Sequence, residues 1–146
     1  MPTQKKFKLY IGCAITEAPV KFASDVKGFK RSLANAGYEI LDFIDLAKEA
    51  TPAEVYKWDI DHCIKECDAF IAICDHPSTG MGFELGEAAR LIKPVLLLAQ
   101  KDVRVTRLVR GAAEVLDSFS MESYETLDQK TLILVIGWLR QQRLTS

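Results

Sequence analysis

Residues 68–86 constrain the fold of this chain more than any other stretch. Residues 68–74 are a short apolar run with β-branched and aromatic side chains, which is typical of a strand buried in a parallel sheet. Gly80 and Gly82 follow, and apolar residues then recur at helical spacing. The pattern predicts a strand, a glycine-bearing loop and a helix, with Glu84 in the first turn of that helix.

The rest of the chain alternates between strand-like and helix-like segments. Strands are predicted at residues 7–13, 38–43, 68–74, 94–99 and 118–121. Helices are predicted from Pro19 to a C-cap at Gly37, from a capping box at Thr51 to about residue 67, and then at residues 84–92, 106–113 and 127–142. Residues 44–50 fit either a loop or a short helical turn.

This alternation predicts an α/β fold, doubly wound, with helices on both faces of a parallel sheet. For a single domain covering residues 1–146, we expect a flavodoxin-like, five-stranded sheet in the order 2-1-3-4-5. The first and third strands then lie side by side, and ligands bind beyond their carboxyl ends. The residues expected to line this crevice with Glu84 are Tyr10, Cys13, Ala14, Asp75, His76 and Ser78.

Glu84 has two interpretations from spacing alone. A carboxylate near a helix N-terminus is stabilised by the helix dipole, by roughly 0.3–1 kcal/mol, without any function. The same dipole would keep the carboxylate ionised, as a nucleophile or general base requires. Gly80 and Gly82 would leave room beside it for a ligand.

Charge and composition exclude several classes of protein. Nineteen basic and twenty acidic residues give a formal charge of −1, so neither nucleic acid nor an anionic membrane is an expected partner. No apolar stretch is long enough to span a bilayer, and no signal peptide is visible, so we expect a cytoplasmic protein. Cys63 and Cys67 lack a second cluster of metal ligands, so the cysteines are expected to be buried free thiols and no metal or cofactor is expected.

Four segments carry a resemblance to a known family: residues 10–15 (YIGCAI), 67–88 (CDAFIAICDHPSTGMGFELGEA), 93–99 (KPVLLLA) and 105–112 (VTRLVRGA). They resemble the nucleoside 2-deoxyribosyltransferase superfamily, and most closely its 2′-deoxynucleoside 5′-phosphate N-hydrolases. The resemblance implies an enzyme that cleaves the N-glycosidic bond of a (2′-deoxy)nucleoside 5′-monophosphate through a covalent glutamyl–sugar intermediate.

The resemblance also assigns roles to residues. Glu84 matches the nucleophile, and Tyr10 matches a tyrosine beside it. Ser78 matches a serine that contacts the 5′-phosphate, where the transferases carry an aspartate. Thr106 matches a residue that reaches the phosphate from a neighbouring subunit, although a helix N-cap explains it equally well. The substrate-binding residues expected on this basis are Ser78, Gly80, Gly82, Ala14, Ile15 and Thr106.

The sequence departs from the family pattern at two positions, that of the general acid and that of the cationic side chain that holds the phosphate. The family aspartate falls at Ile60, which has Asp59 and Asp61 on either side, and we favour Asp59. Thr16 replaces an arginine of the loop after the first strand, so a phosphate would need another cation.

The expected partners are a small-molecule nucleoside or nucleotide and a second copy of the chain. A homodimer or a dimer-based tetramer would share its active sites between subunits. Two alternatives to hydrolysis remain: transfer of deoxyribose between bases, and a non-catalytic nucleotide-binding module.

Overall fold

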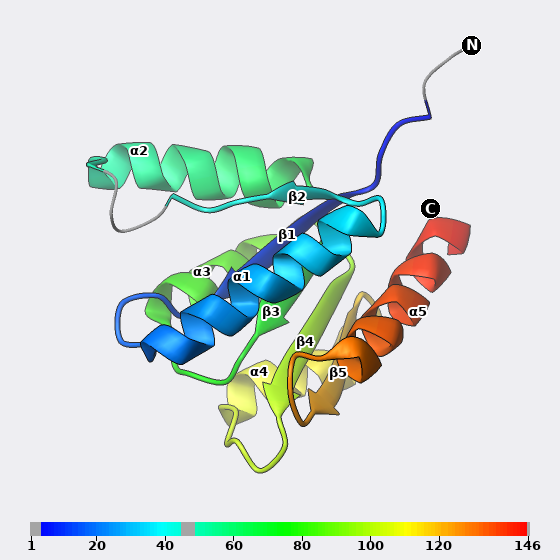
Figure 1. Ribbon diagram of the computed structural model, residues 1–146. Coiled ribbons are helices and arrows are strands. Elements are labelled where there is room, and N and C mark those ends of the chain that lie inside the picture. The colour runs from blue at the N-terminus through cyan, green and yellow to red at the C-terminus, as the bar shows by residue number, and fades with distance from the viewer. Residues whose placement is uncertain (1–3, 45–48, 146) are drawn as a thin grey trace.

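The computed structural model describes residues 4–44 and 49–145. Its single sheet contains five parallel strands in the order β2-β1-β3-β4-β5, which confirms the predicted doubly wound α/β fold (Figure 1). The strands are β1 (Lys8–Cys13), β2 (Glu39–Leu41), β3 (Ala69–Ile73), β4 (Val95–Gln100) and β5 (Phe119–Tyr124).

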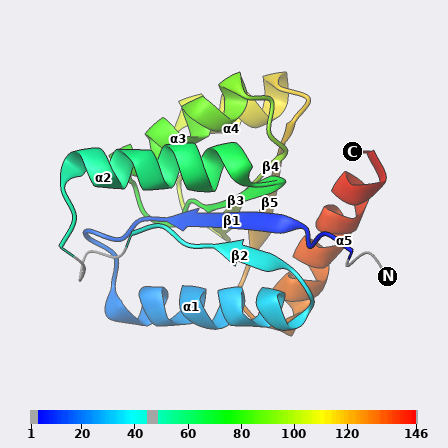
Figure 2. The ribbon, with the colours of Figure 1, turned by 90° about the horizontal axis from the view of Figure 1, so that it is seen from above.

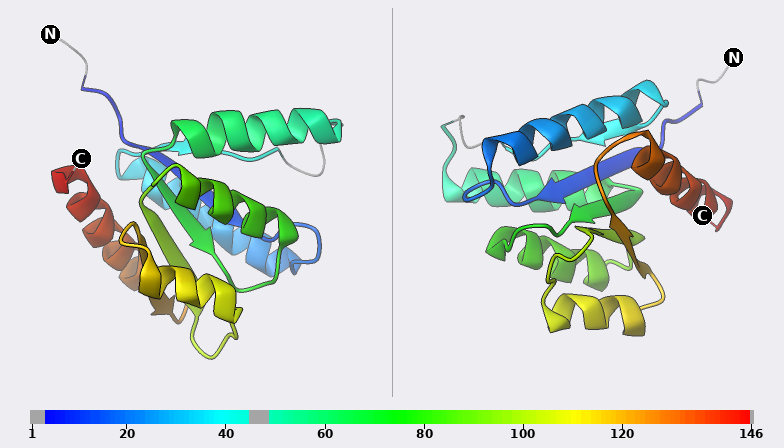
Figure 3. Two further views of the ribbon diagram at one scale, coloured as in Figure 1. Left: turned by 180° about the vertical axis from the view of Figure 1, so that it is seen from behind. Right: turned by 60° about the horizontal axis from the view of Figure 1, so that its bottom comes forward.

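Helices cover both faces of this sheet. They are α1 (Val20–Asn35), α2 (Pro52–Tyr56), the π-helix η1 (Lys57–Ile64) that continues α2, α3 (Thr79–Arg90), α4 (Arg107–Val115) and α5 (Gln129–Thr145). Helices α1 and α5 lie on one face, and α2, η1, α3 and α4 lie on the other (Figures 2 and 3). Among the described residues, none of the helices combines the length and apolar character needed to cross a membrane.

The strands are buried on both sides, as their continuous apolar runs predict. In β1, Leu9 and Ile11 point toward α1 and α5, whereas Tyr10 points toward η1 and α3. Successive strand residues alternate between the two faces, so this register decides that Tyr10 lies on the side of Glu84.

Several local predictions are confirmed. Gly37 ends α1 with a φ of 102°, a conformation that favours glycine. Thr51 and Glu54 form the predicted capping box at the start of α2. Thr106 is the N-cap of α4, since its Oγ1 accepts a hydrogen bond from the Leu108 backbone at 3.2 Å.

Other boundaries differ from the prediction. Strand β2 stops at Leu41 because the next carbonyl, that of Asp42, bonds to side chains of η1 instead of to a neighbouring strand. Strand β5 extends to Tyr124. Of the ambiguous segment 44–50, residues 45–48 lie outside the described residues.

The position of Glu84 in its helix was predicted wrongly. Helix α3 begins at Thr79, because Ser78 is its N-cap and accepts the Met81 backbone N–H at 3.1 Å. Gly80 and Gly82 therefore lie within the helix, and Glu84 is in its second turn.

Candidate active site

Glu84 projects from α3 into the layer between that helix and β1. Its Oε2 oxygen is buried and has no hydrogen-bond partner among the described residues. Burial raises the pKa of Glu84 to about 7, against lowering contributions from the Tyr10 hydroxyl and the Lys30 charge. The expectation that the helix start keeps this carboxylate ionised is thus wrong. The helix dipole acts within the first turn, and Glu84 lies beyond it. Desolvation therefore has the largest effect on the pKa of Glu84.

Tyr10 interacts with the Glu84 carboxylate and acts on its pKa. Its ring is buried in β1 and stacks on Phe70 of β3, with 5.1 Å between the ring centroids. Burial, and then the charge of Glu84, raise the pKa of Tyr10, so its hydroxyl remains protonated and can donate to the carboxylate. The rigid ring pair fixes the direction of this donor.

A second carboxyl, Asp59, lies beside Glu84. The two line one pocket of about 400 Å³. Burial raises the pKa of Asp59, and its charge in turn raises that of Glu84. The other lining residues are Ala50, Pro52, Val55, Tyr56, Ile60, Gly80 and Phe83.

Of the two acidic residues that flank Ile60, only Asp59 lines the pocket. Ile60, at the position that matches the family aspartate, is buried, and Asp61 is exposed and does not line the pocket. A π-helical turn contains one residue more than an α-helical hydrogen-bonded turn. Asp59 lies within this π-helix, and its role as the general acid stays a prediction.

The N-terminal end of α3 leaves open space next to these carboxyls. An added Cβ at Gly82 would meet nothing within 4 Å, and one at Gly80 would approach only the Ser78 Oγ, at 3.9 Å. Packing within the chain therefore does not require either glycine. Ser78 is half-buried, and its hydroxyl hydrogen remains available because the oxygen is the acceptor in the cap.

The remaining residues expected in the crevice lie in other hollows. Cys13, Ala14 and Ile15 line one of about 580 Å³ against α1. Asp75 and His76 line another, of about 380 Å³. These residues do not line the Glu84 pocket itself, and their part in a common crevice stays a prediction.

Asp75 is held away from the Glu84 pocket by its own hydrogen bonds. Its carboxylate accepts hydrogen bonds from the Tyr124 hydroxyl and, at 2.8 Å, from the Gln100 backbone, which hold it toward β4 and β5. His76 instead packs edge-on against Phe22 of α1, with 4.8 Å between the ring centroids. Thr106 is exposed and is not among the residues that line the Glu84 pocket in this single chain.

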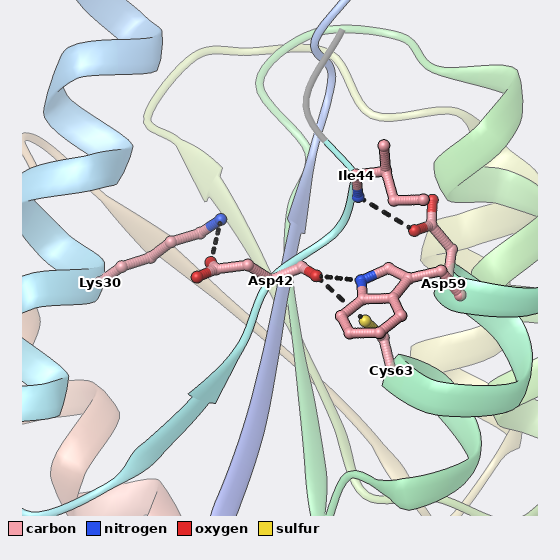
Figure 4. Close-up of polar contacts among 6 residues, drawn as sticks. Lys30, Asp42, Ile44, Asp59 and Cys63 are labelled. Carbon is pink, nitrogen blue, oxygen red and sulfur yellow. Dashed lines mark hydrogen bonds and ion pairs between the residues drawn. The ribbon is translucent and has the colours of Figure 1, made fainter. Parts of the chain in front are cut away.

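Sequence reasoning missed the residues that hold the chain after β2 (Figure 4). Lys30 pairs with the Asp42 carboxylate at 3.3 Å, and Trp58 Nε1 donates to the Asp42 carbonyl at 2.6 Å. One signal was present: Lys30 falls four residues after Val26, beside the apolar face of α1. The four cysteines are buried free thiols, as predicted, and no metal-binding group occurs among the described residues.

Comparison with known proteins identifies the family. No family model matches the chain. A candidate 2′-deoxynucleoside 5′-phosphate N-hydrolase of Thermofilum pendens is 31% identical over 114 residues, which cover 73% of this chain and 78% of the relative. The chain belongs to the nucleoside 2-deoxyribosyltransferase superfamily. This superfamily member is an enzyme, either an N-glycoside hydrolase or a related deoxyribosyltransferase.

Solved structures agree on the fold of this superfamily member. The CMP N-glycosidase of Clostridium botulinum aligns with a TM-score of 0.70 and 23% identity, over 88% of this chain and 98% of that protein. A 2-deoxyribosyltransferase of Bacillus psychrosaccharolyticus aligns with a TM-score of 0.58 and 23% identity, over 86% and 95%. The deoxyribosyltransferase of Leishmania mexicana gives a TM-score of 0.56 and 24% identity, over 86% and 85%.

Proposed function

We propose that this enzyme hydrolyses the N-glycosidic bond of a (2′-deoxy)nucleoside 5′-monophosphate and releases the free base. The observation that carries the proposal is the pairing of Glu84, with its unpartnered buried oxygen, and Asp59 in one pocket. Two carboxyl groups, one nucleophilic and one acidic, are what a retaining glycosidase uses. Nucleotides are also the named substrates of the Thermofilum relative and of the Clostridium enzyme.

The first step forms a covalent intermediate. A carboxylate oxygen of Glu84 attacks C1′, the C1′–N bond breaks, and its electron pair leaves with the base. Asp59 transfers its proton to the departing base nitrogen. Tyr10 holds the Glu84 carboxylate in the orientation for attack.

The second step returns the enzyme to its starting state. Water attacks C1′, Asp59 accepts a proton from that water, and the bond between C1′ and Glu84 breaks. The products are the sugar phosphate and the regenerated carboxylate. If a second base replaced water, the same intermediate would give deoxyribosyl transfer.

Substrate binding would favour the proton on Asp59, which is where the first step needs it. In the free enzyme, burial raises the pKa of both carboxyls, and the pKa of Glu84 reaches about 7. The two groups interact, so they titrate as a pair. A base nitrogen that accepts a hydrogen bond from Asp59 favours the proton on Asp59, which leaves Glu84 ionised for attack.

The 5′-phosphate would bind at the N-terminus of α3. The first-turn backbone N–H groups and the Ser78 hydroxyl suit an anion there, and Gly80 and Gly82 permit close approach. Ala14 and Ile15, in the loop after β1, would complete this side of the substrate. Close approach of the phosphate would explain why α3 carries Gly80 and Gly82, although packing within the chain does not require a glycine at either position.

A second subunit would close the site. Phe83 of α3 and Leu108 of α4 are 58% and 84% exposed on the same side of the sheet. Their burial would favour a homodimer or a dimer-based tetramer, with Thr106 reaching the partner's phosphate. Thr106 is exposed and already ordered by its capping bond, so it is suited to that role.

The test is incubation with a panel of nucleosides and 5′-monophosphates, with and without an acceptor base, following free base by chromatography. We expect base release from a monophosphate and none with Glu84→Gln. Release only in the presence of an acceptor base would favour the transferase. No release from any compound would overturn the proposal.

A further inference from the structure

Residues 42–44, directly after β2, connect helices on opposite faces of the sheet. In Figure 4, Lys30 approaches Asp42 from α1, whereas Cys63 and Asp59 approach the same segment from η1. We propose that Lys30, Asp42 and Trp58 are positioning residues that hold the Ile44 N–H in place to orient the acid Asp59. This inference rests on the proposed function.

The Asp42 carbonyl is fixed by η1. It accepts hydrogen bonds from Trp58 Nε1 at 2.6 Å and from Cys63 Sγ at 3.4 Å. Positions five apart in an α-helix lie about 140° apart around its axis and do not reach one acceptor. The wider π-helical winding brings Trp58 and Cys63 to the same side, so the unusual helix makes this double contact possible.

The Asp42 side chain is fixed by α1. Lys30 Nζ lies 3.3 Å from Asp42 Oδ1, and the lysine side chain is only 13% exposed. The same ammonium lies 4.3 Å from the centroid of the Phe43 ring, so it contacts two successive residues of the segment. Asp42 is therefore held through its carbonyl on one side and its carboxylate on the other.

The held segment then orients Asp59. The Ile44 N–H donates to Asp59 Oδ1 at 3.3 Å. A carbonyl oxygen accepts such a bond better than a hydroxyl oxygen does, so the bond favours the acidic proton on Oδ2 and restrains rotation of the carboxyl group. Loss of the contacts to Asp42 would let Ile44 move and misplace the proton relative to the base.

The test uses variants that leave both carboxyls in place. Trp58→Phe removes one N–H and keeps an aromatic ring, and Lys30→Met removes the cation at Asp42. Lys27→Met is the matched control. Lys27 lies in α1 about one turn before Lys30, lines the same hollow as Lys30 and is exposed. Trp58→Phe keeps the inference testable if Lys30→Met does not fold.

Two substrates separate orientation of the acid from a general structural effect. One is the preferred nucleoside monophosphate. The other is 4-nitrophenyl 2-deoxyribofuranoside 5-phosphate, whose leaving group departs as a stable anion and needs no proton. The plateau kcat/KM of each pH profile is compared, because kcat/KM reports only the first step, in which Asp59 acts as the acid. The plateau is used because the Lys30 charge also lowers the pKa of Glu84.

We expect Trp58→Phe and Lys30→Met to lower kcat/KM on the natural substrate about 10-fold or more. On the nitrophenyl substrate both should match the wild type, and Lys27→Met should match it on both. Natural-substrate activity that is unchanged, or an equal loss on both substrates, would overturn the inference.

Asp59→Asn is the benchmark that separates this inference from the proposed function. If its kcat/KM falls only on the natural substrate, Asp59 is the acid and the positioning variants are judged against it. If its kcat/KM falls equally on both substrates, the acid assignment itself fails and the positioning inference falls with it.

Discussion

The Tyr10 hydroxyl of strand β1 interacts with the Glu84 carboxylate of helix α3. This contact lowers the pKa of Glu84 and opposes the larger effect of burial, which raises it to about 7. The fraction of enzyme with an ionised nucleophile near neutral pH therefore depends on one phenol.

Tyr10→Phe removes this donor and keeps the ring that stacks on Phe70. We expect the pKa of Glu84 to rise, so that the acid limb of the kcat/KM profile moves to higher pH. Activity should fall most at about pH 6 and recover toward about pH 9. A profile with the wild-type acid limb would show that Tyr10 does not act on the nucleophile.

Glu84→Gln should stabilise the protein in a pH-dependent way. The folded-state pKa lies above the ordinary value of 4.5, so the folded protein loses stability as pH rises from about 4.5 to about 7. Removing the carboxyl should raise the free energy of unfolding by up to about 3 kcal/mol at about pH 8 and by little at about pH 4. Urea denaturation at both pH values measures this, and an equal change at both would contradict it.

Ser78→Asp should reverse the preference for a 5′-phosphate. Aspartate caps a helix as well as serine does, so α3 should keep its start at Thr79. The added charge repels a phosphate dianion bound there. The measurement is kcat/KM for a monophosphate and its free nucleoside, with Ser78→Asn as the neutral capping control. If the wild type prefers the free nucleoside, Ser78 has been given the wrong role.

The shared site predicts complementation between inactive subunits. Thr106→Asp keeps the α4 cap but places a negative charge where a partner's phosphate would bind. Mixed with Glu84→Ala subunits, it should form heterodimers that regain part of the activity, because one site per dimer has both wild-type residues. A wild-type protein that sediments as a monomer and still turns over would rule out a shared site.

The sequence predicted the fold well because its local signals agree with one another. Alternating strands and helices gave the 2-1-3-4-5 order, and Gly37 and Thr51 marked helix ends through conformations that few residues satisfy. The start of α3 was missed because Gly80 and Gly82 disfavour a helix interior. The Ser78 cap and the burial of Met81 override that preference.

The candidate site was predictable only in part. Glu84 and Tyr10 could be matched to a motif, and the structure brings them together. The π-helical winding that contains Asp59, and the bonds that turn Asp75 away from the pocket, depend on tertiary contacts. These contacts join residues that are far apart in the chain, so the local spacing of residue types does not predict them.

The most direct test of the account is to trap the covalent intermediate. A 2′-fluorinated nucleoside monophosphate destabilises the oxocarbenium-like transition state of both steps, so that the sugar–enzyme intermediate accumulates. Intact-protein mass spectrometry should show the mass of one fluorinated sugar phosphate per subunit, and peptide mapping should place it on Glu84. An enzyme that cleaves the natural nucleotide but gives no adduct, or carries it on another residue, would contradict the account.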